Sequence, residues 1–131
     1  MIGDMPHTWV GSDFMRSLRS FFVYEREKDD ALVIGAGILE DWARDPAGIE
    51  VKGLRTYYGI LNYKMTMAGE KLIVEVDGNL QMPVGKIILK SPMTADLKAV
   101  KINGKISKSF TAKEVVVNEF PAKIVLDFAI Q

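Results

Sequence analysis

Hydrophobic and polar residues alternate from Tyr57 to Met67, and this alternation predicts a β-strand. Successive side chains of a strand point to opposite faces of a sheet, so residues 57, 59, 61, 63, 65 and 67 share one face. That face is the more apolar of the two, and we expect it to face the core. After a turn at Ala68–Glu70 the alternation resumes at Lys71, which predicts a second strand.

Residues that favour turns divide the rest of this region into short strands. Asp77–Asn79 predicts a turn, because Gly and Asn tolerate positive φ angles at little cost. Asn103–Gly104 lies between two apolar segments, which is the sequence preference of a type I′ hairpin turn. Further strands are predicted at residues 31–34, 49–52, 86–90, 97–102, 105–110, 113–117 and 122–130, with a short helical segment at 39–44.

Near the N-terminus a helical period replaces the alternation. Phe14, Leu18, Phe21 and Phe22 recur at spacings of four, seven and eight residues, which places them on one face of a helix. A serine suited to an N-cap precedes them, and we predict a helix over Ser12–Glu27. Its bulky apolar face needs a partner, which is the β domain, a helical neighbour or a second copy of the chain.

These patterns predict an all-β fold, namely an antiparallel two-sheet β-sandwich preceded by one N-terminal amphipathic α-helix. About eight or nine short strands follow one another at regular spacing, and the length of 131 residues corresponds to one domain. We assign residues 1–28 to an N-terminal extension with the helix and residues 29–131 to the sandwich.

Composition and charge narrow the classes of function. Acidic and basic residues balance at 17 each, and no Lys/Arg-rich run occurs, so neither nucleic acid nor a membrane is an expected partner. The chain has no cysteine, which excludes disulfides and thiolate metal sites. No apolar run approaches the roughly 20 residues of a membrane-spanning helix. No secretory signal is predicted, and the compartment stays open.

Three residues are candidates for carbohydrate contact: Trp9, Trp42 and His7. An indole face suits the apolar face of a pyranose, but the two tryptophans fit core or interdomain packing equally well. His7 is the only histidine, and as a general base it would need an orienting partner, so a structural role is its alternative. The neighbouring acids at Asp29–Asp30 and Glu40–Asp41 do not suggest two carboxylates facing each other across a glycosidase cleft.

The segment Ala31–Gly37 resembles the start of a dinucleotide-binding unit, in which a strand is followed by Gly-x-Gly. The third glycine is replaced by Glu40, an anion at the phosphate position, and Pro46 cuts the following helix short. We therefore interpret this segment as a strand and a loop that needs small residues. We predict no catalytic residue, no metal site and no cofactor in the chain.

Three landmarks made of short motifs occur together in one order. Asp4–Trp9 leads into the amphipathic segment, and Gly35–Ile38 leads to Glu40–Trp42. Gly53–Gly59 precedes the strand-rich region, and Val100–Lys105 follows it. This order resembles the C-terminal end of glycoside hydrolases of the six-hairpin (α/α)₆-toroid type, including rhamnosidase-like enzymes. In such enzymes a β-sandwich follows the last toroid helix.

The resemblance implies a non-catalytic accessory domain that packs against a helical toroid catalytic domain, because the catalytic carboxylates of such enzymes lie upstream in the toroid. The alternative is an independent carbohydrate-binding module that uses exposed aromatic side chains, and a stand-alone enzyme is a third reading. A binding module should show two or three coplanar exposed rings. An accessory domain should leave an apolar face that needs a partner, such as the face formed by Phe14, Leu18, Phe21 and Phe22.

Overall fold

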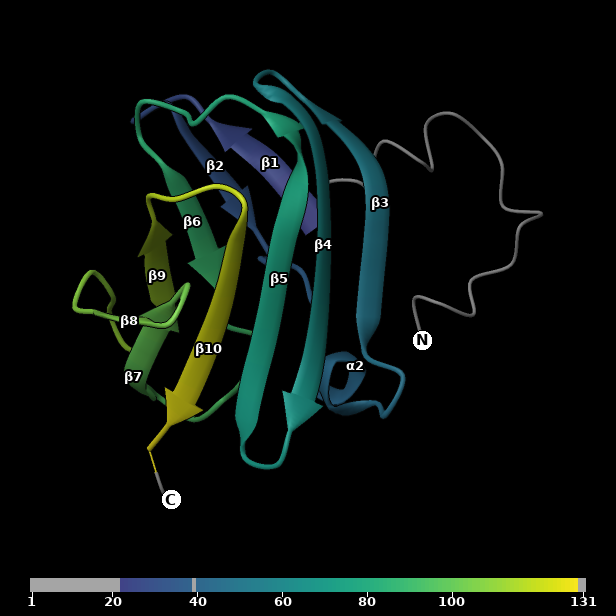
Figure 1. Cartoon of the computed structure of the whole chain (residues 1–131), viewed down its shortest axis with the longest axis vertical. Coiled ribbons are helices and arrows are strands. Elements are labelled where there is room, and N and C mark those ends of the chain that lie inside the picture. The colour runs from purple at the N-terminus through teal and green to yellow at the C-terminus, as the bar shows by residue number, and fades with distance from the viewer. Residues whose placement is uncertain (1–21, 39, 130–131) are drawn as a thin grey trace.

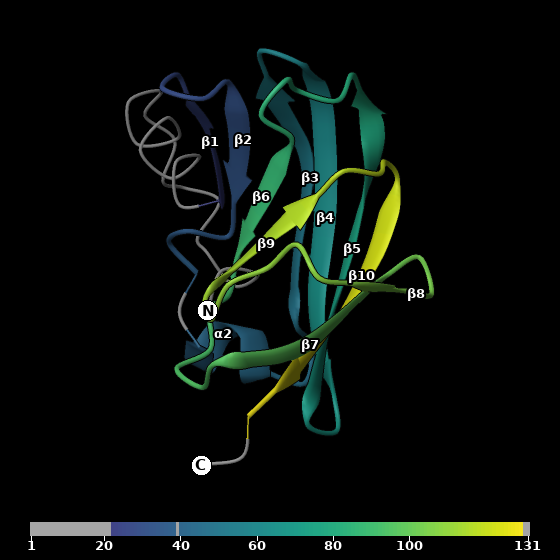
Figure 2. The same cartoon turned by 90° about the vertical axis from the view of Figure 1, so that its left-hand side faces the viewer.

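The computed structural model describes residues 22–38 and 40–129. Two β-sheets pack face to face, which confirms the predicted all-β sandwich (Figures 1 and 2). One sheet has four strands in the order β1-β2-β6-β9, and the other has six in the order β3-β4-β5-β10-β7-β8. The elements are β1 (Val23–Arg26), β2 (Ala31–Ile34), α2 (Glu40–Arg44), β3 (Ile49–Thr56), β4 (Gly59–Ala68), β5 (Lys71–Leu80), β6 (Ile87–Lys90), β7 (Leu97–Ile102), β8 (Lys105–Ser107), β9 (Glu114–Val117) and β10 (Ala122–Phe128).

The longest hairpin is formed by β4 and β5, which pair over ten residues from Gly59↔Leu80 to Ala68↔Lys71. Alternate side chains of both strands are buried against the four-stranded sheet, as their period of two predicts. The buried positions of this hairpin are Leu61, Tyr63, Met65, Leu72, Val74 and Val76.

The last strand of the chain lies inside the six-stranded sheet. β10 pairs with β5 on one side and with β7 on the other, antiparallel to both (Figure 1). Ile124 and Leu126 point into the core and are fully buried. The long-range pairing of β10 therefore joins the early and late halves of this sheet.

The four-stranded sheet contributes the other half of the core, through Leu32, Ile34, Ile87, Leu89, Val115 and Val117. β2 and β6 pair in parallel, whereas the other strand pairs of the described chain are antiparallel. The chain between β2 and β6 makes three strands of the opposite sheet and returns in the same direction. The antiparallel prediction is therefore wrong for this one pair.

The predicted helix over Ser12–Glu27 is wrong at its C-terminal end, because Val23–Arg26 form β1 and pair with β2. Residues 12–21 lie outside the described residues. Phe22, which we assigned to the apolar face of that helix, is buried in the main core. β1 is thus part of the sandwich, which begins ahead of the predicted boundary at residue 29.

A buried hydroxyl group links the two sheets at this point. The Tyr63 Oη atom donates a hydrogen bond of 2.8 Å to the carbonyl oxygen of Phe22, which also accepts one from the Gly35 amide at 3.0 Å. Tyr63 is 2% exposed, and burial raises the pKa of its phenol well above the usual range. The hydrogen bond satisfies a polar group that would otherwise be costly to bury.

Two turn predictions have opposite outcomes. Asn103 and Gly104 both have positive φ, at 52° and 82°, and connect β7 to β8, which confirms the predicted hairpin turn.

The turn predicted at Asp77–Asn79 is wrong, because β5 continues through it. Gly78 lies opposite Leu61 with φ 133°, and the backbones are so close that a Cβ atom there would lie 2.3 Å from the Ile60 carbonyl oxygen. This glycine permits close strand pairing.

The strand predicted from Tyr57 to Met67, which is β4, begins later than predicted. β3 extends to Thr56, so Tyr57 and Tyr58 form the turn to β4, and β4 begins at Gly59. Tyr57, which the alternation placed on the core face, is 75% exposed. Near the other end of the chain, β8 stops at Ser107 rather than continuing to residue 110.

Gly78→Ala should destabilise the domain by roughly 3 kcal/mol, because the new methyl group meets backbone atoms and the φ angle is unfavourable for alanine. Urea unfolding followed by circular dichroism would measure the change. Gly69→Ala is the matched control, since Gly69 also has positive φ but an added Cβ meets no atom within 4 Å. The control should lose only about 1 kcal/mol from backbone strain. Equal losses in both variants would contradict the close-approach explanation.

Candidate functional site

The candidate carbohydrate contacts are not brought together among the described residues. His7 and Trp9 lie outside the residues that the structure describes. Trp42 lies on α2, is half-buried and packs against the main core. This is the packing role that we gave as the alternative to sugar stacking.

α2 is fixed to the end of the sandwich through Glu40. Its Oε1 atom accepts hydrogen bonds from the Thr94 amide at 2.6 Å and the Thr94 hydroxyl at 2.9 Å, and its Oε2 atom accepts one from Arg44 Nε at 2.8 Å. The Thr94 amide, the Arg44 guanidinium and the Thr94 hydroxyl stabilise the charged carboxylate and lower the pKa of Glu40 to about 2. Glu40 therefore acts as a structural clamp between α2 and the loop before β7.

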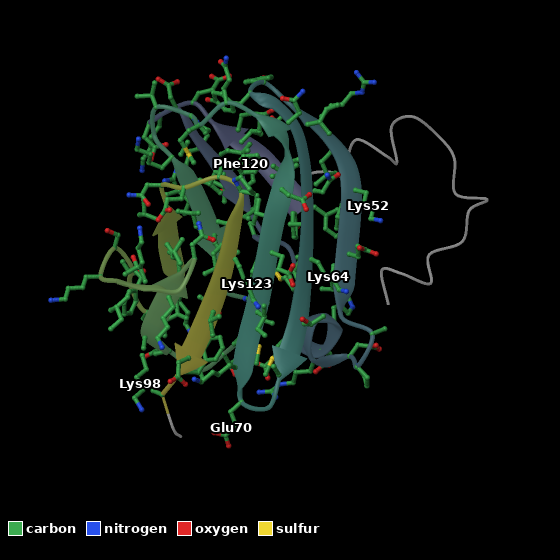
Figure 3. All side chains as sticks on the ribbon, in the orientation of Figure 1. Lys52, Lys64, Glu70, Lys98, Phe120 and Lys123 are labelled. Carbon is green, nitrogen blue, oxygen red and sulfur yellow. The ribbon has the colours of Figure 1, made fainter. Side chains whose placement is uncertain are left out.

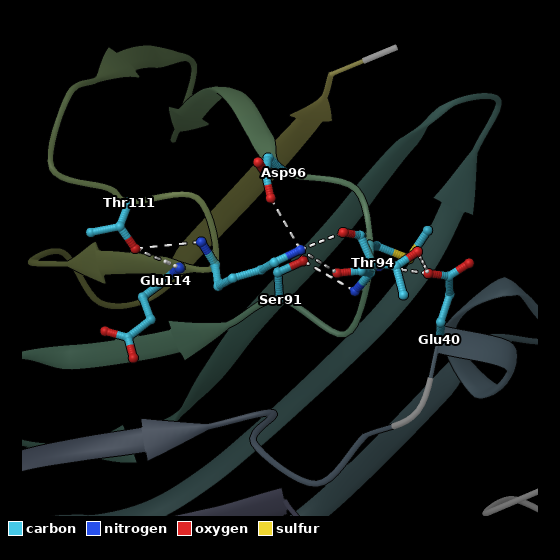
Figure 4. A network of polar contacts seen from close by, with 8 residues as sticks. Glu40, Ser91, Thr94, Asp96, Thr111 and Glu114 are labelled. Carbon is cyan, nitrogen blue, oxygen red and sulfur yellow. Dashed lines mark hydrogen bonds and ion pairs between the residues drawn. The ribbon is translucent and has the colours of Figure 1, made fainter. Parts of the chain in front are cut away.

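Lys113, which directly precedes β9, extends this polar network. Figure 4 shows the network, with Glu40, Thr94 and Asp96 labelled. The Lys113 Nζ atom donates to the carbonyl oxygens of Thr94 and Met93 and forms an ion pair of 3.2 Å with Asp96. The network thus connects α2, the loop between β6 and β7 and the loop before β9. Its charged groups are paired with one another and hold these segments together.

A depression of about 380 Å³ lies beside this network at the end of the sandwich. Met67, Met93 and Phe128 supply its apolar lining, while Glu40 and Arg44 supply an ion pair. Within the described part of the chain, no group of three or more His, Cys, Asp or Glu side chains is placed to hold a metal ion. Its lining residues come from α2, the β4–β5 hairpin, the loop between β6 and β7 and the end of β10.

The outer face of the six-stranded sheet carries charges that alternate from strand to strand. Glu50, Lys64, Glu75 and Lys123 lie in register across β3, β4, β5 and β10. Figure 3 shows the lysines at positions 52, 64 and 123 along this face. A shallow depression of about 510 Å³ between β3 and β5 is lined mainly by polar side chains. The charged side chains of this face are therefore hydrated.

The four-stranded sheet has a different outer surface, which we call the second face. It is the face that points away from the six-stranded sheet. Tyr24, Val33, Ile88 and Val116 form one continuous row across β1, β2, β6 and β9, each residue directly opposite the next. Ala31 lies beside this row, and the five residues form a hydrophobic cluster separate from the main core. Both faces of this sheet are therefore apolar.

Ion pairs border the second face. Arg26, opposite Ala31 in the β1–β2 pair, contacts Asp29 through two hydrogen bonds of 2.9 and 2.7 Å. Lys90 and Glu114, opposite each other on β6 and β9, form an ion pair of 3.0 Å. The centre of the second face, formed by Ala31, Val33 and Ile88, is buried within the chain, whereas Tyr24 and Val116 are half-buried.

The second face was missed in the sequence analysis, although a signal was present. Ala31–Ile34, Ile87–Leu89 and Val115–Val117 are uninterrupted apolar runs with no alternation. Such runs are typical of strands buried on both faces, whereas alternation is typical of strands with one solvated face. The contrast between these runs and the alternating β4 and β5 distinguishes the two sheets.

The structure explains why Gly35 occurs in the segment that resembles a dinucleotide-binding unit. Its φ angle is 81°, and a Cβ atom there would lie 2.8 Å from the carbonyl oxygen of Lys90. The glycine is required because the end of β2 passes close to the end of β6. This confirms the interpretation as a strand followed by a loop that needs small residues.

Exposed aromatic side chains do not form a platform in the described part of the chain. Tyr57 is the one strongly exposed ring there, at the turn between β3 and β4. Its amide donates a hydrogen bond of 2.9 Å to a Glu25 carboxylate oxygen, and the neighbouring Tyr58 packs partly against the core. The two or three coplanar rings expected of a carbohydrate-binding module are not found among residues 22–38 and 40–129.

Comparisons with known proteins found no matching family model, no matching curated protein and no matching solved structure. None of the helices in the described ranges is long and apolar enough to span a bilayer.

Glu40→Gln should remove a stabilising contribution that depends on pH. Because folding lowers the pKa of Glu40 from 4.5 to about 2, its contribution is fully present above pH 4.5 and disappears as the pH falls toward 2. At pH 7 the variant should lose about 1 kcal/mol, since the carboxylate is only partly buried. Between pH 4.5 and 2 the difference from the original protein should shrink.

Thermal unfolding from pH 2 to 7 would measure this effect. Asp41→Asn is the matched control, because it removes the same charge from an exposed position next to Glu40 on α2. If both variants keep a constant difference from the original protein over this range, the clamp role of Glu40 is wrong.

Proposed function

We propose that this chain is a non-catalytic accessory β-sandwich domain of a carbohydrate-active enzyme of the glycoside hydrolase type, and that it packs against a helical catalytic domain. The observation that carries the proposal is the apolar second face, formed by Tyr24, Ala31, Val33, Ile88 and Val116. A sandwich needs one apolar face on each sheet, so a further apolar face is suited to a third layer.

The order of sequence motifs supports a helical layer as this third layer. The resemblance to the end of toroid enzymes implies helices on the N-terminal side of the sandwich. β1 is the first described strand, and it lies at the edge of the four-stranded sheet and contributes Tyr24 to the second face. The first described strand therefore lies beside the apolar second face.

The solvated outer face of the six-stranded sheet favours one orientation of the proposed packing. Its in-register charges would lose their hydration if a partner covered them, and buried charges are costly unless each is paired. Packing through the second face avoids this cost. The side of the domain that carries the second face is therefore the one that should face the catalytic domain, with Tyr24 and Val116 as its half-buried members.

Association with a helical partner would test the proposal. A separately produced (α/α)₆-toroid domain from the same genome should co-elute with this chain in size-exclusion chromatography and gain thermal stability. Val116→Lys places a charge in the half-buried edge of the second face and should weaken association at least about tenfold. Ile106→Lys, at a position that is 76% exposed on β8, should leave it unchanged.

The alternative of an independent binding module makes a different prediction. Affinity electrophoresis in soluble polysaccharides and a glycan array would detect carbohydrate binding by the chain itself. Retardation that Tyr57→Ala abolishes, without toroid association, would overturn the accessory-domain proposal. We expect no retardation, and we expect Tyr57→Ala to associate with the toroid like the original chain.

A further inference from the structure

One asparagine of this chain combines a reactive sequence with a structural role. The chain has four asparagines, and Asn103 is the one that is followed by glycine. We infer that Asn103 is a site of deamidation, that its hydrogen bonds to residues 119–123 protect it in the folded domain, and that the reaction loosens the pairing of β7 with β10. This inference goes beyond the proposed function and does not depend on it.

The side chain of Asn103 completes the ladder between β7 and β10. Ile102 lies opposite Ile124 in this pair, and one step further the Asn103 amide donates to the Lys123 carbonyl oxygen at 2.9 Å. In a regular antiparallel pair the Lys123 amide would donate back to the carbonyl oxygen of Asn103. Here the chain turns at Asn103, with φ 52°, and the Lys123 amide donates to the side-chain Oδ1 atom at 2.8 Å instead.

The other end of the same side-chain amide is also held. Its Nδ2 atom donates to the Pro121 carbonyl oxygen at 3.3 Å and to Glu119 Oε1 at 3.4 Å. These partners fix the orientation of the amide, because a backbone N–H group only donates and a carbonyl oxygen only accepts. Asn103 therefore joins the β7–β8 turn to the segment that leads into β10.

The conformation of the turn opposes deamidation. In this reaction the Gly104 nitrogen attacks Asn103 Cγ, and glycine hinders the attack least because it has no side chain. The planar imide that forms requires a negative ψ angle at the asparagine, whereas the left-handed region has ψ near about +47°. The φ angle of Asn103 is typical of that region, and its amide is bonded to residues 119–123. The turn and these hydrogen bonds must therefore open before the ring can close.

The reaction uses this chain and water alone. A bond forms between the Gly104 nitrogen and Asn103 Cγ, and the bond from Cγ to Nδ2 breaks. Nδ2 leaves as ammonia and takes the proton of the Gly104 nitrogen. Water then adds to one of the two imide carbonyl groups, which gives either aspartate or isoaspartate. Asn103 is exposed in the structure, so water reaches the site.

Neither product restores the original contacts. Aspartate has a carboxylate oxygen in place of Nδ2, and this oxygen cannot donate to the Pro121 carbonyl or to Glu119. It also places a second negative charge beside Glu119. In isoaspartate the main chain runs through the former side-chain carbons, which lengthens the two-residue turn by one atom. The β7–β8 hairpin should therefore be held less firmly to β10.

The rate of deamidation in the folded and the unfolded chain tests the protection. The full chain would be incubated in mildly alkaline buffer with and without concentrated guanidinium chloride, and mass spectrometry with peptide fragmentation would follow each asparagine. In denaturant Asn103 should react ahead of the internal controls Asn79 and Asn118. In buffer its rate should be at least about tenfold lower, because the turn must open first.

Two results of this comparison would overturn the inference. Equal rates of Asn103 deamidation in buffer and in denaturant would mean that the fold does not protect the site. A rate in denaturant no higher than that of Asn79 or Asn118 would mean that Asn103 is not a preferred site of the reaction.

Asn103→Asp reproduces one product and tests its effect on the domain. The variant should unfold at a Tm about 5 °C lower than the original chain, because Nδ2 is lost and a charge is added beside Glu119. Asn118→Asp is the matched control, since it adds the same charge next to Glu119 at an exposed position, and its Tm should change by at most about 2 °C. Equal shifts in the two variants, measured by thermal unfolding, would show that the Asn103 amide does not hold the hairpin.

Discussion

Burial of alternate side chains of β4 and β5 against the four-stranded sheet is the interaction on which the domain depends. The hairpin pairs over ten residues, and its inner row meets the inner row of β2, β6 and β9. Tyr63 adds a directional contact to this nonpolar packing, because its hydroxyl group holds the Phe22 carbonyl at the start of β1. The first described strand is therefore positioned by a residue in the middle of the chain.

The sequence predicted the elements whose local pattern agrees with their tertiary surroundings. Strands β4, β5 and β10 alternate and have one solvated face, and Asn103–Gly104 forms a turn because both residues have positive φ. Gly78 was wrongly assigned to a turn, because a glycine is favoured both in turns and where two strands approach closely. Only the position of the Ile60 backbone in the structure distinguishes these two roles. Likewise, local spacing wrongly assigned residues 23–26 to a helix, since spacing contains no information on the pairing of β1 with β2.

The candidate site was harder to predict than the fold. Trp42 was selected as a candidate sugar contact because of its indole ring, yet it packs against the core. The second face consists of aliphatic residues and one tyrosine, and none of these residues by itself indicates a binding or catalytic role. What marks this face is the combination of a row across four strands, apolar surface on both sides of one sheet and a charged rim. The opposite surface carries in-register charges, so one outer sheet face is charged and the other is apolar.

The position of β10 has a consequence for how the domain is made. β10 follows β5 and β7 in sequence but lies between them in the sheet. During synthesis, β5 therefore has an open edge until residues 122–128 leave the ribosome, and β3–β4–β5 and β7–β8 remain two separate pieces. Open edges of this kind pair readily with other chains. A translation product that stops before residue 122 is therefore not a smaller sandwich but two sheet fragments that expose β5 to aggregation.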